Sequence, residues 1–562
     1  MYIRTTSRKT KDGTVRYLQL AHSEWDAAAG MSRPKILFSF GREDQLDRAS
    51  IERLIAALSR LLDPAAAATA IAAPAMPELS VTDSRPIGGT HLLDALWHRL
   101  GIDAALRKHT DERTERILFA LVANRALAPS SKLAATDWIA GDVHINGLPE
   151  VNDESCYRAM DRLQKCEPQV AEQVYFQVTD LLNLEVDLLF FDTTSTYFEL
   201  DDADEPVPRD KDGRIADDPD EAVKEIGFRT HGKSKDHRDD LPQVVVGMAV
   251  TRDGIPVRVW SWPGNTSDSD LIRQVKDDMR AWSLSRIIWV ADRGFSSNKN
   301  RRALMQGAGG YIIGEKLRSG SPEVKAALAR QGRYAQVADN MQVKEVRLAD
   351  FPDRFVLCFN PDQATRDAAV RDRLVAQLGE VIADTDKLTK VERAKIEGSL
   401  AGKPGLKRFL RVTPGGLLRV DKKKIATEAN LDGKYLLRCS DPHLSSEDIA
   451  LGYKQLLEVE RGWRDMKSVL DLRPVYHRRE DRIRSHVVLC WPALLLVRVA
   501  ETTSGQTWQR IRTHAQRLHA VTFTGPAGQF RQSTELTKPQ RDVFTALAIE
   551  PPKRVQDATP SA

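Results

Sequence analysis

Three acidic residues stand where their side chains could share metal ions. The apolar runs LLFFD and IIWVAD end on Asp192 and Asp292, and Glu460 lies in the helix-like stretch YKQLLEVERGWRDMK. Magnesium ions prefer carboxylate oxygens as ligands. Two such ions about 4 Å apart can activate an attacking oxygen and stabilise a leaving oxygen during in-line displacement at phosphorus. The three carboxylates are therefore candidates for a two-metal phosphoryl-transfer site.

The stretch around Glu460 carries two more polar side chains at regular spacing. Tyr453, Glu460 and Lys467 recur at intervals of seven residues. Seven residues are close to two helical turns, so one helix over this stretch would carry all three side chains on one face, in a row about 20 Å long. Taken singly, each residue has a plainer interpretation as a turn former, a packing residue or a solvated helix residue. The joint pattern favours a site.

The segment that holds Asp192 and Asp292 has the pattern of a mixed sheet. The runs VDLLFFD, TSTYFEL, QVVVGMAVT, IPVRVWSWP and RIIWVAD are rich in β-branched and aromatic residues, as strands are. A helix-like run and the strand-like GYIIGE follow Asp292. This order predicts an α/β fold. Open α/β sheets place their sites at the carboxyl ends of strands, where we expect both aspartates to lie.

Composition and hydrophobic period divide the rest of the chain. Residues 1–63 form a predicted small α+β module, with a hairpin at Asp12-Gly13 and a helix at 50–62. Residues 64–79 are Ala/Pro-rich, as linkers are. The other predicted segments are a helical domain at 80–183, the first part of the sheet core at 184–316, an inserted subdomain at 317–445, the last part of the core with the Glu460 helix at 446–500, and a C-terminal helical region and tail at 501–562.

The composition is that of an ordinary protein with sizeable cores. The 562 residues carry a net charge of only +4, so binding to a nucleic acid would depend on local basic surfaces. The five cysteines form no CxxC pair, and the N-terminus lacks the apolar core of a signal peptide. The run VVLCWPALLLV is about half the length of a membrane span, so it predicts a buried helix. These features favour the cytoplasm.

A basic stretch follows Glu460. Lys467, Arg473, His477 and Arg478 lie in it, and they would form a locally positive surface beside the carboxylates. Binding of DNA phosphates there would weaken steeply with salt. Acidic residues are interleaved, so a solvated helix of mixed charge is the alternative. Trp463 could stack on an extruded base, or it could belong to the core.

These residues resemble the bacterial insertion-sequence DDE transposases, in the group with a Tyr-x2-Arg-x3-Glu-x6-Lys signature. Here the signature is Tyr453-x2-Leu456-x3-Glu460-x6-Lys467, so a leucine replaces the arginine. In that family the arginine and the tyrosine are associated with holding phosphates at the transposon end. The residues that could replace the arginine are Lys454, Arg461 and Arg464, unless this subgroup dispenses with the contact.

The resemblance extends over roughly residues 155–499, including KSKDHRDDLPQVVVGMAV, PGNTSDSD and DRGFSS. It implies an RNase H-like core with a mostly-β insertion at 317–445. It also implies two Mg²⁺ ions, or Mn²⁺ as a substitute, held by Asp192 with Asp292 and by Asp192 with Glu460. The expected partners are double-stranded DNA of the transposon ends and the target, and a second copy of the chain in the DNA complex. The expected location is the bacterial cytoplasm, at the nucleoid.

Two other functions remain open at this point. A catalytically inactive, transposase-derived DNA-binding protein would not nick end-bearing DNA in the presence of metal. An RNase H-like nuclease or resolvase would cut DNA but would not join a pre-cut 3′-hydroxyl end to a second duplex. The N-terminal module and the helical domain are the candidates for recognising and pairing DNA ends.

Overall fold

The computed structural model describes residues 2–10, 13–26, 31–46, 51, 79–182, 184, 188–218, 220, 222–282, 287–307, 309–318, 320–525 and 528–560. The chain forms two compact units. The first comprises Met1–His91, Asp142–His144 and Thr513–Ala562, and the second comprises Leu92–Gly141 and Ile145–Arg512. The predicted helix at 50–62, the linker at 64–79 and the turn residue Asp12 lie almost wholly outside the described residues.

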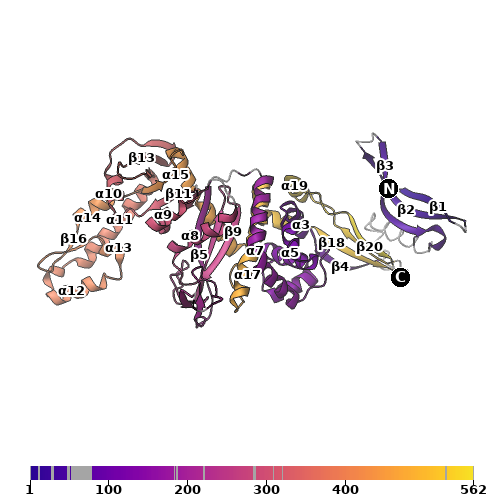
Figure 1. Ribbon diagram of the computed structural model, residues 1–562, viewed down its shortest axis with the longest axis horizontal. Coiled ribbons are helices and arrows are strands. Elements are labelled where there is room, and N and C mark those ends of the chain that lie inside the picture. The colour runs from indigo at the N-terminus through magenta and orange to yellow at the C-terminus, as the bar shows by residue number, and fades with distance from the viewer. Residues whose placement is uncertain are drawn as a thin grey trace. The chain divides into compact units, whose positions relative to one another are not determined.

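A nine-stranded mixed sheet forms the centre of the second unit (Figure 1). Its order is β12-β13-β14-β17-β11-β10-β5-β8-β9. β10 (Ile288–Ala291) runs parallel to both β5 (Leu188–Tyr197) and β11 (Gly310–Glu315). β8 (Gln243–Val250) and β9 (Pro256–Pro263) follow antiparallel on the other side of β5. The predicted α/β fold is therefore confirmed.

The apolar runs of the sequence become strands that are buried on both faces. Every residue of β8, β9 and β10 is buried, and these strands accordingly show little alternation of apolar and polar residues. Continuous apolar runs are expected of strands that have layers on both sides. The two runs VDLLFFD and TSTYFEL form the single strand β5, so Asp192 lies inside a strand rather than at its end. β8 pairs with β5 beyond the point where β10 stops.

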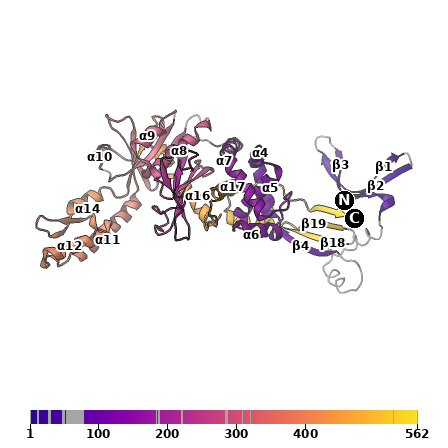
Figure 2. The ribbon, with the colours of Figure 1, turned by 60° about the horizontal axis from the view of Figure 1, so that its bottom comes forward.

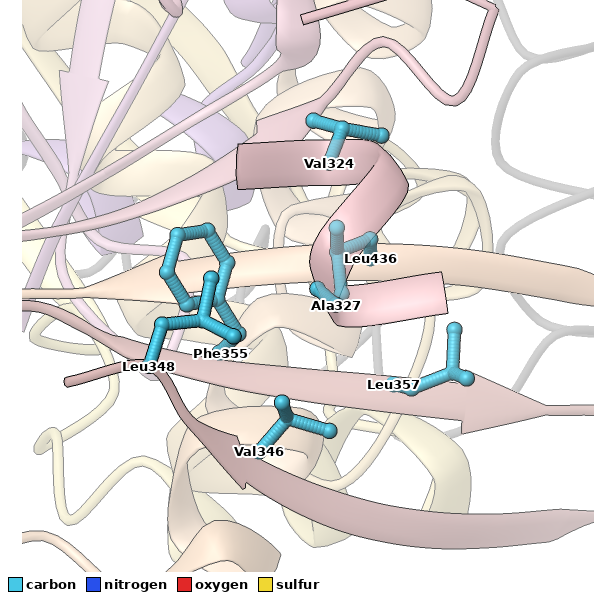
Figure 3. Packing of buried hydrophobic residues seen from close by; sticks show 7 residues of the cluster. All are labelled: Val324, Ala327, Val346, Leu348, Phe355, Leu357 and Leu436. Carbon is cyan, nitrogen blue, oxygen red and sulfur yellow. The ribbon is translucent and has the colours of Figure 1, made fainter. Parts of the chain in front are cut away.

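The predicted insertion extends this sheet and adds a helical layer. β12 (Ala335–Ala338), β13 (Met341–Arg347), β14 (Arg354–Phe359) and β17 (Lys434–Cys439) continue the sheet from β11. α10 (Pro322–Ala329) packs Val324 and Ala327 against Phe355, Leu357 and Leu436 of these strands (Figure 3). β17 pairs directly with β11, so the insertion is hydrogen-bonded to the core sheet.

The prediction of a mostly-β insertion is wrong. α11 (Pro361–Ile382), α12 (Lys390–Ser399), α13 (Pro404–Lys407) and α14 (Lys422–Ala429) lie together beyond the sheet (Figure 2). They enclose their own core with the short hairpin of β15 (Leu410–Val412) and β16 (Leu418–Val420), built around Leu378, Leu400, Leu406, Phe409 and Leu418. The run DAAVRDRLVAQLGEVI within α11 has a helical pattern, whereas the mostly-β expectation came from the family resemblance.

The helical domain packs against the other edge of the sheet. Its helices within the second unit include α4 (Ile102–Arg107), α5 (Glu112–Leu127), α6 (Lys132–Asp137) and α7 (Asp153–Leu181). α5 and α7 contact α17 (Glu480–Ser504), which in turn contacts β9. Of the described helices, α17 is the one long and apolar enough to cross a membrane, and 94% of its most apolar window is buried inside the protein. This position matches the predicted core helix.

The prediction of one continuous helix through Tyr453, Glu460 and Lys467 is also wrong. α15 (Ser446–Lys454) carries Tyr453, and α16 (Leu457–Ser468) carries Glu460 and Lys467. Between them the backbone N–H of residue 456 donates to the carbonyl of residue 453, and that of 458 to 455. Such i to i−3 bonds are those of a tighter 3₁₀ turn, which interrupts the α-helical ladder.

The first unit is built from two antiparallel sheets. β1 (Tyr2–Thr10), β2 (Gly13–Asp26) and β3 (Met31–Arg42) form one sheet, in which Thr10 pairs with Gly13 as the predicted hairpin requires. β4 (Ser80–Pro86), β18 (His519–Gly525), β19 (Gly528–Ser533) and β20 (Val555–Pro560) form the other.

Two helical predictions need correction on account of this second sheet. The expected helical domain begins with the strand β4, and α3 (Gly88–Arg99) follows it. The expected C-terminal helical region contains α18 (Trp508–Ala515) and α19 (Lys538–Ala546), but it also supplies three strands. β4 and β18 come from opposite ends of the chain, so local pattern gives no sign of their pairing.

A cluster of cationic side chains is buried among α5, α6 and α17. Lys132 Nζ lies 3.4 Å from Nδ1 of His486, and Arg125 donates to the carbonyl oxygen of Asp471 at 3.2 Å. The pKa of Lys132 is lowered to about 7, mainly by burial and in addition by the positive charge of Arg125. At neutral pH the folded protein therefore holds this lysine only partly protonated.

We expect Lys132 to make the stability of the protein depend on pH. The unfolded chain keeps its proton on this lysine up to about pH 10.5, whereas the folded chain releases it near pH 7. The unfolded state holds more protons between these values, so the contribution to stability rises with pH by up to about 1.4 kcal/mol per unit. The thermal midpoint of Lys132→Met should rise less between pH 7 and pH 9 than that of the wild type, as measured by calorimetry. Lys165→Met, which changes an exposed lysine of α7, is the control. Equal pH dependence of wild type and Lys132→Met would contradict the expectation.

Candidate active site

The structure brings the three predicted carboxylates to one cavity. Asp192, Asp292 and Glu460 all line a cavity of about 780 Å³. Phe191 of β5 pairs with Ala291, the last residue of β10. The residues that follow this pair, Asp192 and Asp292, therefore lie side by side. Glu460 comes from the first turn of α16, where its side chain is exposed. Its neighbour Val459 is fully buried, which holds this turn against the core.

Asp192 lies in the most unfavourable electrostatic environment of the three. The pKa of Asp192 is raised to about 6: burial is the largest cause, the negative charges of Asp292 and Asp268 add to it, and the Lys235 ammonium opposes it. Lys235 Nζ lies 3.6 Å from Oδ1 of Asp192 and 3.3 Å from Oδ2 of Asp268. A carboxylate that is partly desolvated and faces another carboxylate gains from any added cation.

Tyr453 is directed at Asp292. Its hydroxyl donates to Oδ1 of Asp292 at 3.2 Å, and burial together with that carboxylate raises the pKa of Tyr453, so the phenol stays protonated. Gly314 of β11 provides the space, because a Cβ there would lie 2.5 Å from the Tyr453 hydroxyl oxygen. The ring of Tyr453 also stacks on that of Tyr435, with 6.0 Å between ring centroids. The signature tyrosine therefore orients one carboxylate of the site.

The donor set fits a hard divalent cation. The three carboxylates supply oxygen ligands only, which suits Mg²⁺ or Mn²⁺ rather than softer metals. Among the described residues, no group of three His, Cys, Asp or Glu side chains is arranged closely enough to hold an ion as it stands. Sharing an ion therefore requires these side chains to move closer together. The Asp292 charge is one of the causes that raise the pKa of Asp192. A bound cation would offset this repulsion, so its binding would favour that movement.

Two protein-family models match the chain. A model of the N-terminal domain of IS1634 family transposases matches residues 3–69, and a model of the transposase DDE domain matches residues 226–497. The chain belongs to the insertion-sequence DDE transposases. The family that the sequence resembles is thus confirmed. The DDE match includes Asp292 and Glu460 and begins after Asp192.

A solved structure is similar to this transposase over much of its length. It is a piggyBac transposase in a synaptic complex with hairpin DNA, with 11% sequence identity and a TM-score of 0.31. The similarity covers 81% of this chain and 76% of that chain. At this TM-score the neighbour supports no conclusion about the transposase. Comparison with curated proteins found no match.

The candidate DNA contacts of the transposase fall into two groups. Lys454, Arg464 and Arg478 are exposed, and Lys454 also lines the cavity with Leu456. Arg461 donates to Glu501, and Lys467 and Arg473 both donate to Asp236. The pKa of His477 is lowered to about 4, mainly by burial and in addition by the charge of Lys132, so this histidine is neutral at pH 7. The structure therefore leaves fewer free cations near Glu460 than the sequence indicates.

Trp463 belongs to the core. Only 6% of its surface is exposed, on the face of α16 that packs against the sheet and α17. Of the two interpretations of this tryptophan, packing is the one that agrees with the structure. Stacking on an extruded base would require α16 to leave its place.

Sequence reasoning missed three charged residues beside the carboxylates, namely Lys235, Asp236 and Asp268. Thr193 Oγ1 donates to Oδ1 of Asp268 at 2.9 Å, and Lys235 donates to the carbonyl oxygen of Thr193 at 2.6 Å. The signal was present in SKDHRDD, a charged run placed directly before the buried strand β8. Its position could have suggested a loop at the site, but nothing in the sequence shows which carboxylate it reaches.

We expect Gly314→Ala to displace the Tyr453 ring from Asp292. The added Cβ would overlap the hydroxyl oxygen, and the stacked Tyr435 ring restricts the retreat of Tyr453. DNA cleavage by the purified variant should fall by about tenfold to a hundredfold, as for a misplacement of about 1 Å at a site. Tyr453→Phe keeps the ring and removes the hydrogen bond, so it should show a similar loss. Full cleavage by both variants would show that the Tyr453 hydroxyl does not orient Asp292.

Proposed function

We propose that the transposase binds the double-stranded DNA ends of its own insertion sequence, cleaves them by two-metal-ion hydrolysis and joins the 3′-hydroxyl ends to target DNA. The observation that carries this proposal is the convergence of Asp192, Asp292 and Glu460 on one cavity from β5, β10 and α16. The family match supports DNA as the substrate.

The proposal includes an RNase H-like core made of β9, β8, β5, β10 and β11. The strand directions support it. β9, β8 and β5 pair antiparallel in succession, and β10 and β11 then run parallel to β5. The carboxylates then lie on the central strand, directly after its parallel neighbour and on a helix that follows the insertion. The inserted subdomain lines the other side of the same cavity through residues such as Arg318, Arg371 and Arg408.

Each carboxylate has a role in the proposed mechanism. Asp192 and Asp292 would hold one Mg²⁺ or Mn²⁺ ion, and Asp192 with Glu460 would hold the second. When bound, the two ions supply the charge that favours in-line displacement at phosphorus. Tyr453 keeps one oxygen of Asp292 in a fixed direction through its hydrogen bond. Lys235 lies 3.6 Å from Oδ1 of Asp192 and donates to the carbonyl oxygen of Thr193, the next residue of β5, which holds the strand beside Asp192.

The proposed reaction consists of two displacements. In the first, water oxygen bonds to the phosphorus at the transposon end, and the bond from that phosphorus to the 3′ oxygen breaks. In the second, the freed 3′-hydroxyl bonds to a target phosphorus and displaces the 3′ oxygen of the target strand. No covalent bond to the protein forms. We place this reaction in the bacterial cytoplasm at the nucleoid, in a homodimer bound to DNA, with Lys454, Arg464 and Arg478 among the phosphate contacts.

Loss of either a strand carboxylate or the helix carboxylate should abolish cleavage. Asp292→Asn and Glu460→Gln each remove a ligand charge, so the rate of Mg²⁺-dependent nicking should fall by at least about a hundredfold. The assay uses the purified protein and a duplex that carries one end of the element. Glu447→Gln, which changes an exposed glutamate of α15, is the matched control and should cleave normally. Full cleavage by Asp292→Asn or Glu460→Gln at saturating Mg²⁺ would mean that the ligands are wrongly assigned.

The other two functions give different results in the same assay. An inactive DNA-binding relic would bind the duplex but leave it uncut even as the wild-type protein. A nuclease without strand transfer would cut, but it would not join a pre-cut 3′-hydroxyl end to a plasmid. The proposal requires both nicking and joining.

Lys454 should be a direct phosphate contact. Lys454→Ala should weaken DNA binding and make the slope of log K against log salt concentration shallower by roughly 0.9. Arg461→Ala is the comparison, because Arg461 already pairs with Glu501 at 3.1 Å and should change the slope less. Titrations by fluorescence anisotropy at several salt concentrations measure both slopes. A larger change for Arg461→Ala than for Lys454→Ala would contradict the assignment.

A further inference from the structure

Residues 234–239, which we call the 234–239 loop, lie between the two elements that carry Asp192 and Glu460. Two consecutive side chains of this loop reach different elements. Lys235 contacts β5 and the first residue of α8 (Asp268–Asp278), whereas Asp236 contacts α16 and the segment that follows it. The sheet and the helix that supply the proposed ligands are thereby joined through one short piece of chain.

The Lys235 contacts fix the strand side. Its ammonium donates to both the carbonyl oxygen and the hydroxyl of Thr193 at 2.6 Å, and it lies 3.6 Å from Oδ1 of Asp192. The Thr193 hydroxyl in turn donates to Asp268, which also faces the ammonium at 3.3 Å. One cation therefore joins two carboxylates and the backbone next to Asp192.

The Asp236 contacts fix the helix side. Its carboxylate accepts from Lys467 Nζ at 3.0 and 3.2 Å and from Arg473 at 3.0 Å. The exposed fractions of these side chains are 19% for Asp236, 16% for Lys467 and 26% for Arg473, so the three charges are largely shielded from water. Ion pairs are screened less when they are partly buried. Lys467 lies on α16 with Glu460, so the pair holds the helix that carries the third carboxylate.

The loop itself has a fixed shape. The backbone N–H of Lys235 donates to the Ser195 hydroxyl at 2.9 Å, and that of Ser234 donates to Asp239 at 2.6 Å. His237 has a φ of 58°, in the left-handed region that residues other than glycine rarely adopt. Such a conformation persists only where the surrounding contacts hold it. The side chains of Lys235 and Asp236 are therefore presented from a rigid support.

We propose that Lys235 and Asp236 are positioning residues that hold Asp192 on β5 and Glu460 on α16 in the relative placement that catalysis needs. This inference rests on the proposed function. Asp192 and Glu460 line the cavity, whereas Lys235, Asp236 and Lys467 are not among its lining residues. They act through the two carboxylates and not on the substrate. In this account Lys467 serves α16 as an anchor rather than serving DNA as a phosphate contact.

A double-mutant cycle between Asp236 and Lys467 tests the inference in the full-length protein. The variants are Asp236→Asn, Lys467→Met and the two combined, and Asp240→Asn is the matched control. Asp240 lies next to the loop and pairs with Arg238, but its carboxylate is exposed. Two readouts are needed: hydrogen exchange of the α16 amides without DNA, with the α11 amides as internal reference, and cleavage kinetics resolved into kcat and KM.

We expect Asp236→Asn and Lys467→Met each to speed exchange in α16 by at least about tenfold, because the helix loses its anchor, and to leave α11 unchanged. Each should lower kcat by about tenfold to a hundredfold with little change in KM, which is the effect of misplacing a ligand rather than losing a binding contact. The double variant should be no slower than the slower single variant, because both remove the same contact. Asp240→Asn should match the wild type in both readouts.

The opposite interpretation gives opposite results. If Asp236 merely screens a DNA contact made by Lys467, Asp236→Asn binds DNA more tightly, Lys467→Met raises KM, and α16 exchanges at the wild-type rate in both. That result would overturn the positioning role. The exchange readout needs no DNA and no turnover, so it stands even if the wild-type protein fails to cleave. Failure of the proposed function and failure of this inference are thus separate outcomes.

Discussion

The parallel pairing of β10 with β5 places Asp192 beside Asp292, and two neighbouring carboxylates in a half-buried position repel each other. Several other contacts of the second unit compensate for this repulsion. Lys235 lies behind Asp192, Tyr453 donates to Asp292, and Gly314 makes room for that tyrosine. A divalent cation between the carboxylates would compensate more strongly than any of these groups.

The insertion is bound to the same arrangement through the sheet. β17 pairs with β11, and Tyr435 of β17 stacks on Tyr453, which contacts Asp292. The insertion also lines the cavity that the carboxylates face, and its cations there are paired, Arg318 with Glu428 and Arg371 with Asp432. This part of the cavity wall is therefore a surface of mixed charge.

The α/β fold and the strands that bring Asp192 and Asp292 together could be predicted from the sequence because both depend on local pattern. Continuous apolar runs marked β5, β8 and β10, and the two aspartates followed such runs directly. The break between α15 and α16 was not predictable from spacing, because 455 and 456 keep nearly helical backbone angles and differ only in their hydrogen-bond partners.

Contacts between distant parts of the chain were also out of reach of the sequence. The pairing of β4 with β18 and the ion pair of Asp236 with Lys467 both depend on packing of distant segments. The basic stretch after Glu460 shows the consequence most clearly. Its composition suggested a surface for phosphates, whereas Lys467 and Arg473 are already bound to a carboxylate.

The proposed mechanism requires that Asp192, Asp292 and Glu460 together hold the metal ions of the reaction. Anomalous diffraction of Mn²⁺ in crystals of the transposase bound to a DNA end tests this requirement. We expect one Mn²⁺ between Asp192 and Asp292, and a second within coordination distance of both Asp192 and Glu460, with ligand distances of about 2.0–2.3 Å. Mn²⁺ bound elsewhere in the protein, with Asp192 still paired to Lys235 alone, would contradict it.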